Sequence, residues 1–260
     1  MDKSSFLGLI VGVGGIVAGL LLEGGRLSQV LQPTAAIIVF GGTLGAILLQ
    51  FPTPVVASAF RRLVQVFFEQ KRDPQETVQQ LVGFANKARR NGMISLDADL
   101  PAVHDPFLKK SLMLAVDGTE PQELRKMMQL EIDNQAEREE NIPKVFESAG
   151  GFAPTIGIIG AVLGLIQVMQ HLDNINEVGK GIAVAFVATV YGVGSANLFF
   201  LPSSGKLRLR IREEQIIREM TLEGVVSILE GMNPRMLETK LRGFLRERPG
   251  DAGPRRTQWN

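Results

Sequence analysis

The fold of this chain is decided by the run Ala153-Pro154-Thr155-Ile156-Gly157-Ile158-Ile159-Gly160-Ala161-Val162-Leu163-Gly164-Leu165. This run lies inside residues 148–172, which contain no Asp, Glu, Lys or Arg. A transmembrane helix needs about 20 apolar residues, so residues 152–172 are predicted to cross a membrane. Gly160 and Gly164 are four positions apart, and small residues at this spacing let two helix backbones approach closely in lipid.

Three further stretches have no charged side chain: residues 6–22, 27–60 and 181–205. Their apolar parts predict three more spans, at residues 6–22, 33–51 and 181–201. The sequence therefore predicts an all-α, multi-pass membrane protein with four transmembrane helices and a helical cytoplasmic domain. The first span could instead be the core of a signal peptide, but Glu23-Gly24-Gly25-Arg26 behind it is not a small-x-small cleavage site.

Small residues also recur in the other spans. They are Gly8, Gly12, Gly15 and Gly19 in the first, Gly41 and Gly45 in the second, and Ala188, Gly192 and Ala196 in the fourth. Such faces pack either against the other helices of the same chain or against other subunits.

The distribution of basic residues predicts the orientation. The links at residues 23–32 and 173–180 hold two of the 28 Lys and Arg residues, Arg26 and Lys180. All other basic residues lie in the N-terminus, in residues 52–147 or after residue 201. Because basic segments stay on the cytoplasmic side, both termini and residues 52–147 are expected in the cytoplasm and both links outside.

Residues 52–147 are predicted to form helices. The segment Asp73-Pro74-Gln75-Glu76 has the acidic N-cap, the proline and the Glu of a helix start, and Asn91-Gly92 predicts the end of that helix. A second start is expected at Thr119-Glu120-Pro121-Gln122.

Residues 202–248 are predicted to continue span four as a cytoplasmic helical extension. Asn233-Pro234 should interrupt it, and a short last helix is expected at residues 236–245. Residues 249–260 are rich in Pro and Gly and are predicted to be disordered.

Composition excludes several kinds of chemistry. The net charge of +1 gives no indication of a nucleic-acid partner. The chain has no Cys, which excludes disulfides and Cys-ligated metals, and its two histidines, His104 and His171, are too few for a multi-His metal site. No paired-carboxylate site, Ser/His/Asp set or phosphate loop is supported. We therefore predict no enzyme activity, no cofactor and no metal.

The span interiors also lack any ionisable residue, which transporters of ions normally keep in the membrane. The polar side chains that remain are Thr43, Thr155, Gln167, Thr189, Tyr191, Ser195 and Asn197. If this protein serves an ion pathway, the carboxylate must come from another chain.

Several runs together resemble the flagellar stator A subunits of the MotA/PomA family. The first is the quoted run at residues 153–165, which is similar to the third span of the family. The fourth span is matched by Gly181-Ile182-Ala183-Val184-Ala185-Phe186-Val187-Ala188-Thr189-Val190-Tyr191-Gly192 and continues through residues 197–207. Residues 87–97, 105–108 and 116–119 look like the rotor-facing region of the family. The resemblance covers roughly residues 1–248.

The resemblance implies a bacterial inner-membrane subunit of a proton-driven torque generator. In this family, five A subunits surround a dimer of a MotB-like B subunit, which has one span, an intramembrane Asp and a peptidoglycan-binding domain. Ion flow is thought to turn the A ring and to drive a FliG-like rotor switch protein. The partners implied are therefore the B subunit, the rotor protein and further copies of this chain.

The resemblance assigns the ion pathway to Pro154, Ala161, Thr189 and Pro202. Pro154 and Pro202 resemble the functional prolines of the family, although a helix start and a kink would also explain them. Thr189 resembles the threonine that faces the ion-carrying aspartate. Ala161 stands where typical sodium-driven members have Thr, and the loss of that hydroxyl ligand favours protons.

The resemblance also implies rotor contact by Arg89, Arg90, Asp97 and Asp99, which match charged positions of the family. Asn86 and Ala98 stand where some members carry acids. A solvated charged face is the alternative explanation.

Two other functions stay open at this point. An energiser of envelope transport of the TolQ/ExbB type shares the ancestral core but typically has three spans. A static membrane scaffold would have no ion flux.

Overall fold

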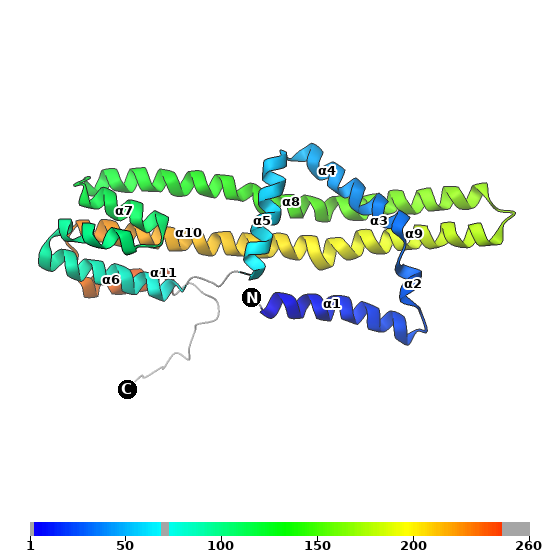
Figure 1. The fold of residues 1–260 in the computed structure, drawn as a ribbon, viewed down its shortest axis with the longest axis horizontal. Helices are drawn as coiled ribbons and strands as arrows, with labels where there is room; N and C mark the ends of the chain where they lie inside the picture. Colours follow the sequence, from blue (N-terminus) through cyan, green and yellow to red (C-terminus); the bar gives the residue numbers. More distant parts are fainter. Residues whose placement is uncertain (1–2, 69–72, 246–260) are drawn as a thin grey trace, which may run out of the picture. The chain divides into compact units, whose positions relative to one another are not determined.

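The computed structural model describes residues 3–68 and 73–245, and within these ranges every element is a helix (Figure 1). The prediction of an all-helical protein is confirmed. The predicted disorder of residues 249–260 lies outside the described ranges. The described residues form two compact units, the first from residues 3–68 and 138–210 and the second from residues 73–137 and 211–245.

The first unit contains the apolar helices. They are α1 (Lys3–Leu22), α2 (Leu27–Val30), α3 (Pro33–Ala36), η1 (Ile37–Gly41), α4 (Gly42–Gln50), α5 (Thr53–Phe68), α9 (Ile175–Ser195), η3 (Ala196–Phe200) and parts of α8 (Pro121–Gln170) and α10 (Leu201–Leu229). Among the described residues, three helical stretches are long and apolar enough to span a membrane: Pro33–Gln50, and parts of Pro121–Gln170 and of Ile175–Leu229. The apolar part of α1, Phe6–Leu22, is shorter.

The third span is part of a longer helix than the sequence indicates. Instead of one helix that starts at Pro121 and another that starts near residue 152, α8 runs through both segments as one helix of 50 residues. Pro143 and Pro154 lie inside it. Each proline removes one N–H donor, but packing by neighbouring helices keeps such a helix continuous.

Two π-helical segments interrupt the spans. The first, η1, lies in the second span, and η3 lies between α9 and α10. The sequence analysis did not predict either of them, because a π turn has no periodicity that distinguishes it from an α-helix over five residues.

The second unit contains the more polar helices. They are α6 (Pro74–Asn91), η2 (Met93–Ala102), α7 (Pro106–Val116), α11 (Pro234–Leu245), the first part of α8 and the last part of α10. Their buried side chains form one core, in which Leu81, Leu112, Met128, Val225 and Leu241 take part.

The predicted ends of these helices are confirmed. The Asp73 carboxylate accepts a hydrogen bond from the backbone N–H of Gln75 at 2.9 Å, which caps α6. Gly92 ends α6 with a φ of 81°, a conformation that costs glycine little. The helix start at Pro121 also stands where the sequence placed it. The last helix, expected at residues 236–245, begins two residues earlier, because Pro234 occupies its first turn, where the missing N–H costs nothing. The sequence analysis did not define α5, η2 and α7.

Candidate functional site

The centre of the first unit is a seam along which α8 and α9 touch through their backbones (Figure 1). A Cβ atom added to Gly164 would lie 2.8 Å from the carbonyl oxygen of Gly181 and 2.9 Å from the backbone nitrogen of Ala185. A Cβ atom on Gly192 would lie 2.5 Å from the carbonyl oxygen of Ala153. Only glycine fits at these positions, so the small residues of spans three and four serve packing within the chain.

The glycines of the first two spans behave differently. Nothing in the described residues lies within 4 Å of a Cβ atom placed on Gly8, Gly15, Gly19, Gly41 or Gly45. Gly12 and Gly42 are exceptions, because an added Cβ atom would lie 3.1 Å from Cδ2 of Leu198 on Gly12 and 2.8 Å from Cγ2 of Ile156 on Gly42.

Three of the residues predicted for the ion pathway lie along the α8–α9 seam. A Cβ atom on Gly157 would lie 3.5 Å from the Cα atom of Thr189, so these two residues face each other. Pro154 precedes Gly157 by three residues and Ala161 follows it by four, about one helical turn in each direction. The half-buried hydroxyl of Thr189 donates to the carbonyl oxygen of Ala185 at 3.2 Å. Its oxygen lone pairs are still available to accept a hydrogen bond.

Pro202 lies two residues after the end of the π segment η3. The backbone N–H of Leu201 donates to the carbonyl oxygen of Ala196, five residues earlier. Pro202 has no N–H to continue the ladder, so the widened turn and the proline together loosen the helix at this point. A Cβ atom on Gly150 would lie 2.6 Å from Cδ2 of Leu201, which places this junction beside α8, one turn before Pro154.

Tyr191 is a site residue to which the sequence analysis gave no role. Its hydroxyl donates to the carbonyl oxygen of Val30 at 2.6 Å and accepts from the backbone N–H of Gln32 at 3.3 Å. Its ring stacks on Phe40, with 5.9 Å between the centroids. The only tyrosine of the chain therefore ties the link before α3 to α9, two residues from Thr189.

The residues predicted for rotor contact gather at one corner of the second unit. Arg89 and Arg90 are exposed in the last turn of α6, and Asp97 is exposed in η2. Asp99 differs from them, because both of its carboxylate oxygens accept from Nζ of Lys87, at 2.8 and 2.7 Å. Lys87 belongs to the run that resembles the rotor-facing region, but its ion pair with Asp99 was not predicted. This pair leaves Asp97 as the more accessible of the two acids.

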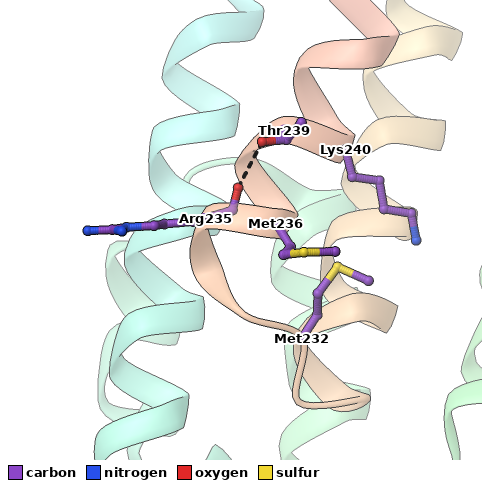
Figure 2. Close-up of a pocket in the computed structure, with 5 residues that line it drawn as sticks. All are labelled: Met232, Arg235, Met236, Thr239 and Lys240. Atoms are coloured by element: carbon purple, nitrogen blue, oxygen red, sulfur yellow. Dashed lines mark hydrogen bonds between the residues drawn. The ribbon is translucent and has the colours of Figure 1, made fainter.

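An open groove of about 520 Å³ lies on the second unit, lined by Met232, Arg235, Met236, Thr239 and Lys240 (Figure 2). Its lining is apolar apart from two cations and a hydroxyl that donates back to the carbonyl oxygen of Arg235 at 3.0 Å. The groove has no carboxylate, imidazole or thiol in its lining, so its residues offer no general base or nucleophile.

Beside this groove, Glu223 joins three helices. Its carboxylate pairs with Arg125 of α8 at 2.6 Å and with Lys240 of α11. The hydrogen bond from Arg125, with a smaller contribution from Lys240, lowers the pKa of the Glu223 carboxyl, although partial burial opposes this shift. The same hydrogen bond raises the pKa of Arg125.

Replacing Glu223 with Gln should loosen α11. The charge-assisted hydrogen bonds of Glu223 are worth about 2 kcal/mol, so hydrogen exchange at the α11 amides should quicken by about 30-fold. Because its folded pKa is lowered, this stabilisation is present above the unfolded pKa of about 4.3 and is lost as the pH falls through the folded value. The exposed pair Arg242–Glu238 gives a matched control, since Glu238→Gln should change exchange by less than about threefold. Equal effects of the two variants would contradict this role of Glu223.

Apolar helices that are long enough to span a membrane and that are joined along a glycine seam define an all-helical, multi-span membrane protein. The family model described as Motility protein A N-terminal matches residues 6–92, and the model of the MotA/TolQ/ExbB proton channel family matches residues 100–220. The chain belongs to the motility protein A family, within the MotA/TolQ/ExbB proton channels.

Similar proteins and structures extend over nearly the whole chain. Motility protein A of Bacillus subtilis is 36% identical, over 94% of this chain and 91% of its own length. Chemotaxis protein PomA of Vibrio alginolyticus is 30% identical, over 95% and 96% of the two chains. A solved C. jejuni MotAB structure covers 100% of both chains at 32% identity with a TM-score of 0.90. The flagellar MotAB stator complex of Bacillus subtilis matches with a TM-score of 0.85 at 35% identity, over 94% and 96% of the two chains.

Proposed function

We propose that this chain is the A subunit of a flagellar stator, which works with a MotB-like B subunit in the bacterial inner membrane. One observation carries the proposal: Thr189 lies on a tightly packed seam of two spans that contain no carboxylate. Such a seam can line an ion pathway only if a partner supplies the ion-binding acid. The full-length similarity to chains of solved MotAB complexes supports this partner.

The proposal also assigns roles in the ion pathway to individual residues. Thr189 faces the acid of the B subunit, and Pro154 and Pro202 let the two long helices bend as that acid gains and loses its proton. One charge that crosses the membrane releases about 2.3 kcal/mol per 100 mV, which is enough to drive such a bend. Ala161 supplies no oxygen ligand, so the transported ion is a proton and not sodium.

The test is deletion of the gene with swimming and flagellar assembly scored separately. Cells without the chain should assemble flagella that do not rotate, and restored swimming should follow the proton gradient. A TolQ/ExbB-type energiser would instead leave swimming intact and impair envelope transport. A motor that stalls in sodium-free buffer at constant proton-motive force would show that the ion is wrongly assigned.

The proposed membrane topology has four spans, at residues 6–22, 33–51, 152–172 and 181–201. The cytoplasm contains the domain at residues 52–147, the extension at residues 202–248 and the tail at residues 249–260. Five copies of the chain surround two B-subunit helices. The charge asymmetry supports this orientation, because Arg26 and Lys180 are the only basic residues in the two outer links.

Cysteine labelling should confirm this orientation, because the chain has no Cys of its own. A Cys at Gln29 or Asn176 should react with an impermeant thiol reagent in intact cells once any outer membrane is made permeable. A Cys at Gln79, an exposed position of α6, should react only after lysis. The opposite labelling pattern would reverse the topology.

Rotor contact is proposed for the corner that carries Arg89, Arg90, Asp97 and Asp99. Arg90→Glu should reduce swimming strongly, because it puts an acid where the rotor surface is expected to be acidic. A charge reversal on the rotor protein should restore part of the motility, and less of it at high salt. Lys126→Glu is the matched control, since Lys126 is an exposed residue of the same unit outside this corner. Normal swimming by both Arg89→Glu and Arg90→Glu would identify the corner as a solvated face.

A further inference from the structure

Helix α5 has one face that packs on the rest of the first unit. The side chains of Val56, Ala59 and Leu63 are buried. The ring of Phe60 meets the ring of Phe146 edge-on, with 5.4 Å between the centroids. These contacts fix which side of α5 points away from the unit.

The outward face of α5 is apolar and basic. Val64 and Phe68 are four residues apart on this face, and their exposed fractions are 57% and 58%. Arg61 is exposed beside them. Residues 53–68 contain no Asp or Glu. Aromatic and aliphatic side chains next to arginine are typical of a helix that lies in the headgroup layer of a bilayer.

We propose that this face of α5 lies in the headgroup layer of anionic phospholipid, with Arg61 paired to a lipid phosphate. Two observations favour lipid over a second copy of the chain or water. The charge is complementary, since the face is basic and has no acid. The helix also begins three residues after the apolar helix Pro33–Gln50 ends, so its start lies at the membrane boundary. The inference goes beyond the stator function and uses the proposed topology only to choose the inner leaflet.

The immersion of α5 can be measured on the full complex with the B subunit, in symmetric vesicles that contain anionic lipid. A bimane probe at Val64→Cys should be quenched by lipids that carry a nitroxide on the acyl chain, and little by iodide in the buffer. The matched probe is Gln122→Cys, at an exposed position of α8 in the second unit, where iodide alone should quench. Quenching of the Val64 probe by iodide would place the face in water. Protection from both quenchers would place it against another subunit, and either outcome would overturn the proposal.

The role of Arg61 has its own test. Native mass spectrometry of the complex should show that Arg61→Gln retains about fivefold less anionic lipid than the parent, as expected for one basic residue at a charged surface. Arg61→Lys should retain as much as the parent. If Arg61→Gln retained as much anionic lipid as the parent, the proposed pairing of Arg61 with a lipid phosphate would be wrong. Neither measurement requires rotation, so a failure here is distinct from a failure of the stator function.

Discussion

Replacing Gly192 with Ala is expected to abolish swimming and to prevent recovery of the chain as an intact complex. The new methyl group would lie 2.5 Å from the carbonyl oxygen of Ala153 and 3.1 Å from the Cα atom of Gly157. Both are backbone atoms, which cannot rotate away, so α8 and α9 must separate along their whole seam. Overpacking of a tight interior costs about 1–3 kcal/mol, and a rigid backbone contact lies at or above the top of this range.

The control for this prediction lies two residues further along the same helix. Gly194 has no atom within 4 Å of an added Cβ atom, so Gly194→Ala should leave the α8–α9 pair intact. Swimming and the yield of purified complex should be measured for both variants. A normal yield of Gly192→Ala complex would mean that the seam is not the closest contact of these two spans.

Thr189→Ala is expected to stop or strongly slow rotation while the complex still assembles. The Cα atom of Thr189 lies opposite Gly157, and its hydroxyl donates to the carbonyl oxygen of Ala185 in its own helix. Loss of that bond costs little stability, but loss of the oxygen removes the one polar group proposed to meet the partner's acid. Stator assembly and swimming speed should be measured together.

Two further variants separate chemistry from packing. Thr189→Ser keeps the hydroxyl and should restore most of the speed. Thr43 is another threonine in a span, buried and bonded to the carbonyl oxygen of Val39 at 2.6 Å, so Thr43→Ala should lower stability without a specific effect on rotation. Rotation at full speed by Thr189→Ala would remove this residue from the ion pathway.

Local signals in the sequence were sufficient for much of the fold. The cap of Asp73, the turn at Gly92 and the proline at Pro121 each act within a few residues, and each predicted helix end is where the structure has it. The continuity of α8 could not be predicted in this way. Pro154 disfavours a helix locally, and only the packing of distant residues keeps that helix intact.

The same difference between local sequence signals and contacts of distant residues explains which features of the site could be predicted. The glycine spacing of the spans predicted close helix contacts, but it could not tell the seam at Gly164 from the unoccupied face at Gly15. The two hydrogen bonds of Tyr191 join residues about 160 positions apart, so no local pattern points to them. Asp99 was grouped with Asp97 by its type, and only the fold shows that Lys87 neutralises it.

The unbroken course of α8 has a mechanical consequence. Within the first unit, α8 extends from Pro154 back to Arg138, which is 16 steps or about 24 Å at 1.5 Å per residue. A bend of about 5° at Pro154 would displace the end of this segment at Arg138 by about 2 Å. A small rearrangement around a single protonated group would thus become a larger displacement one segment away.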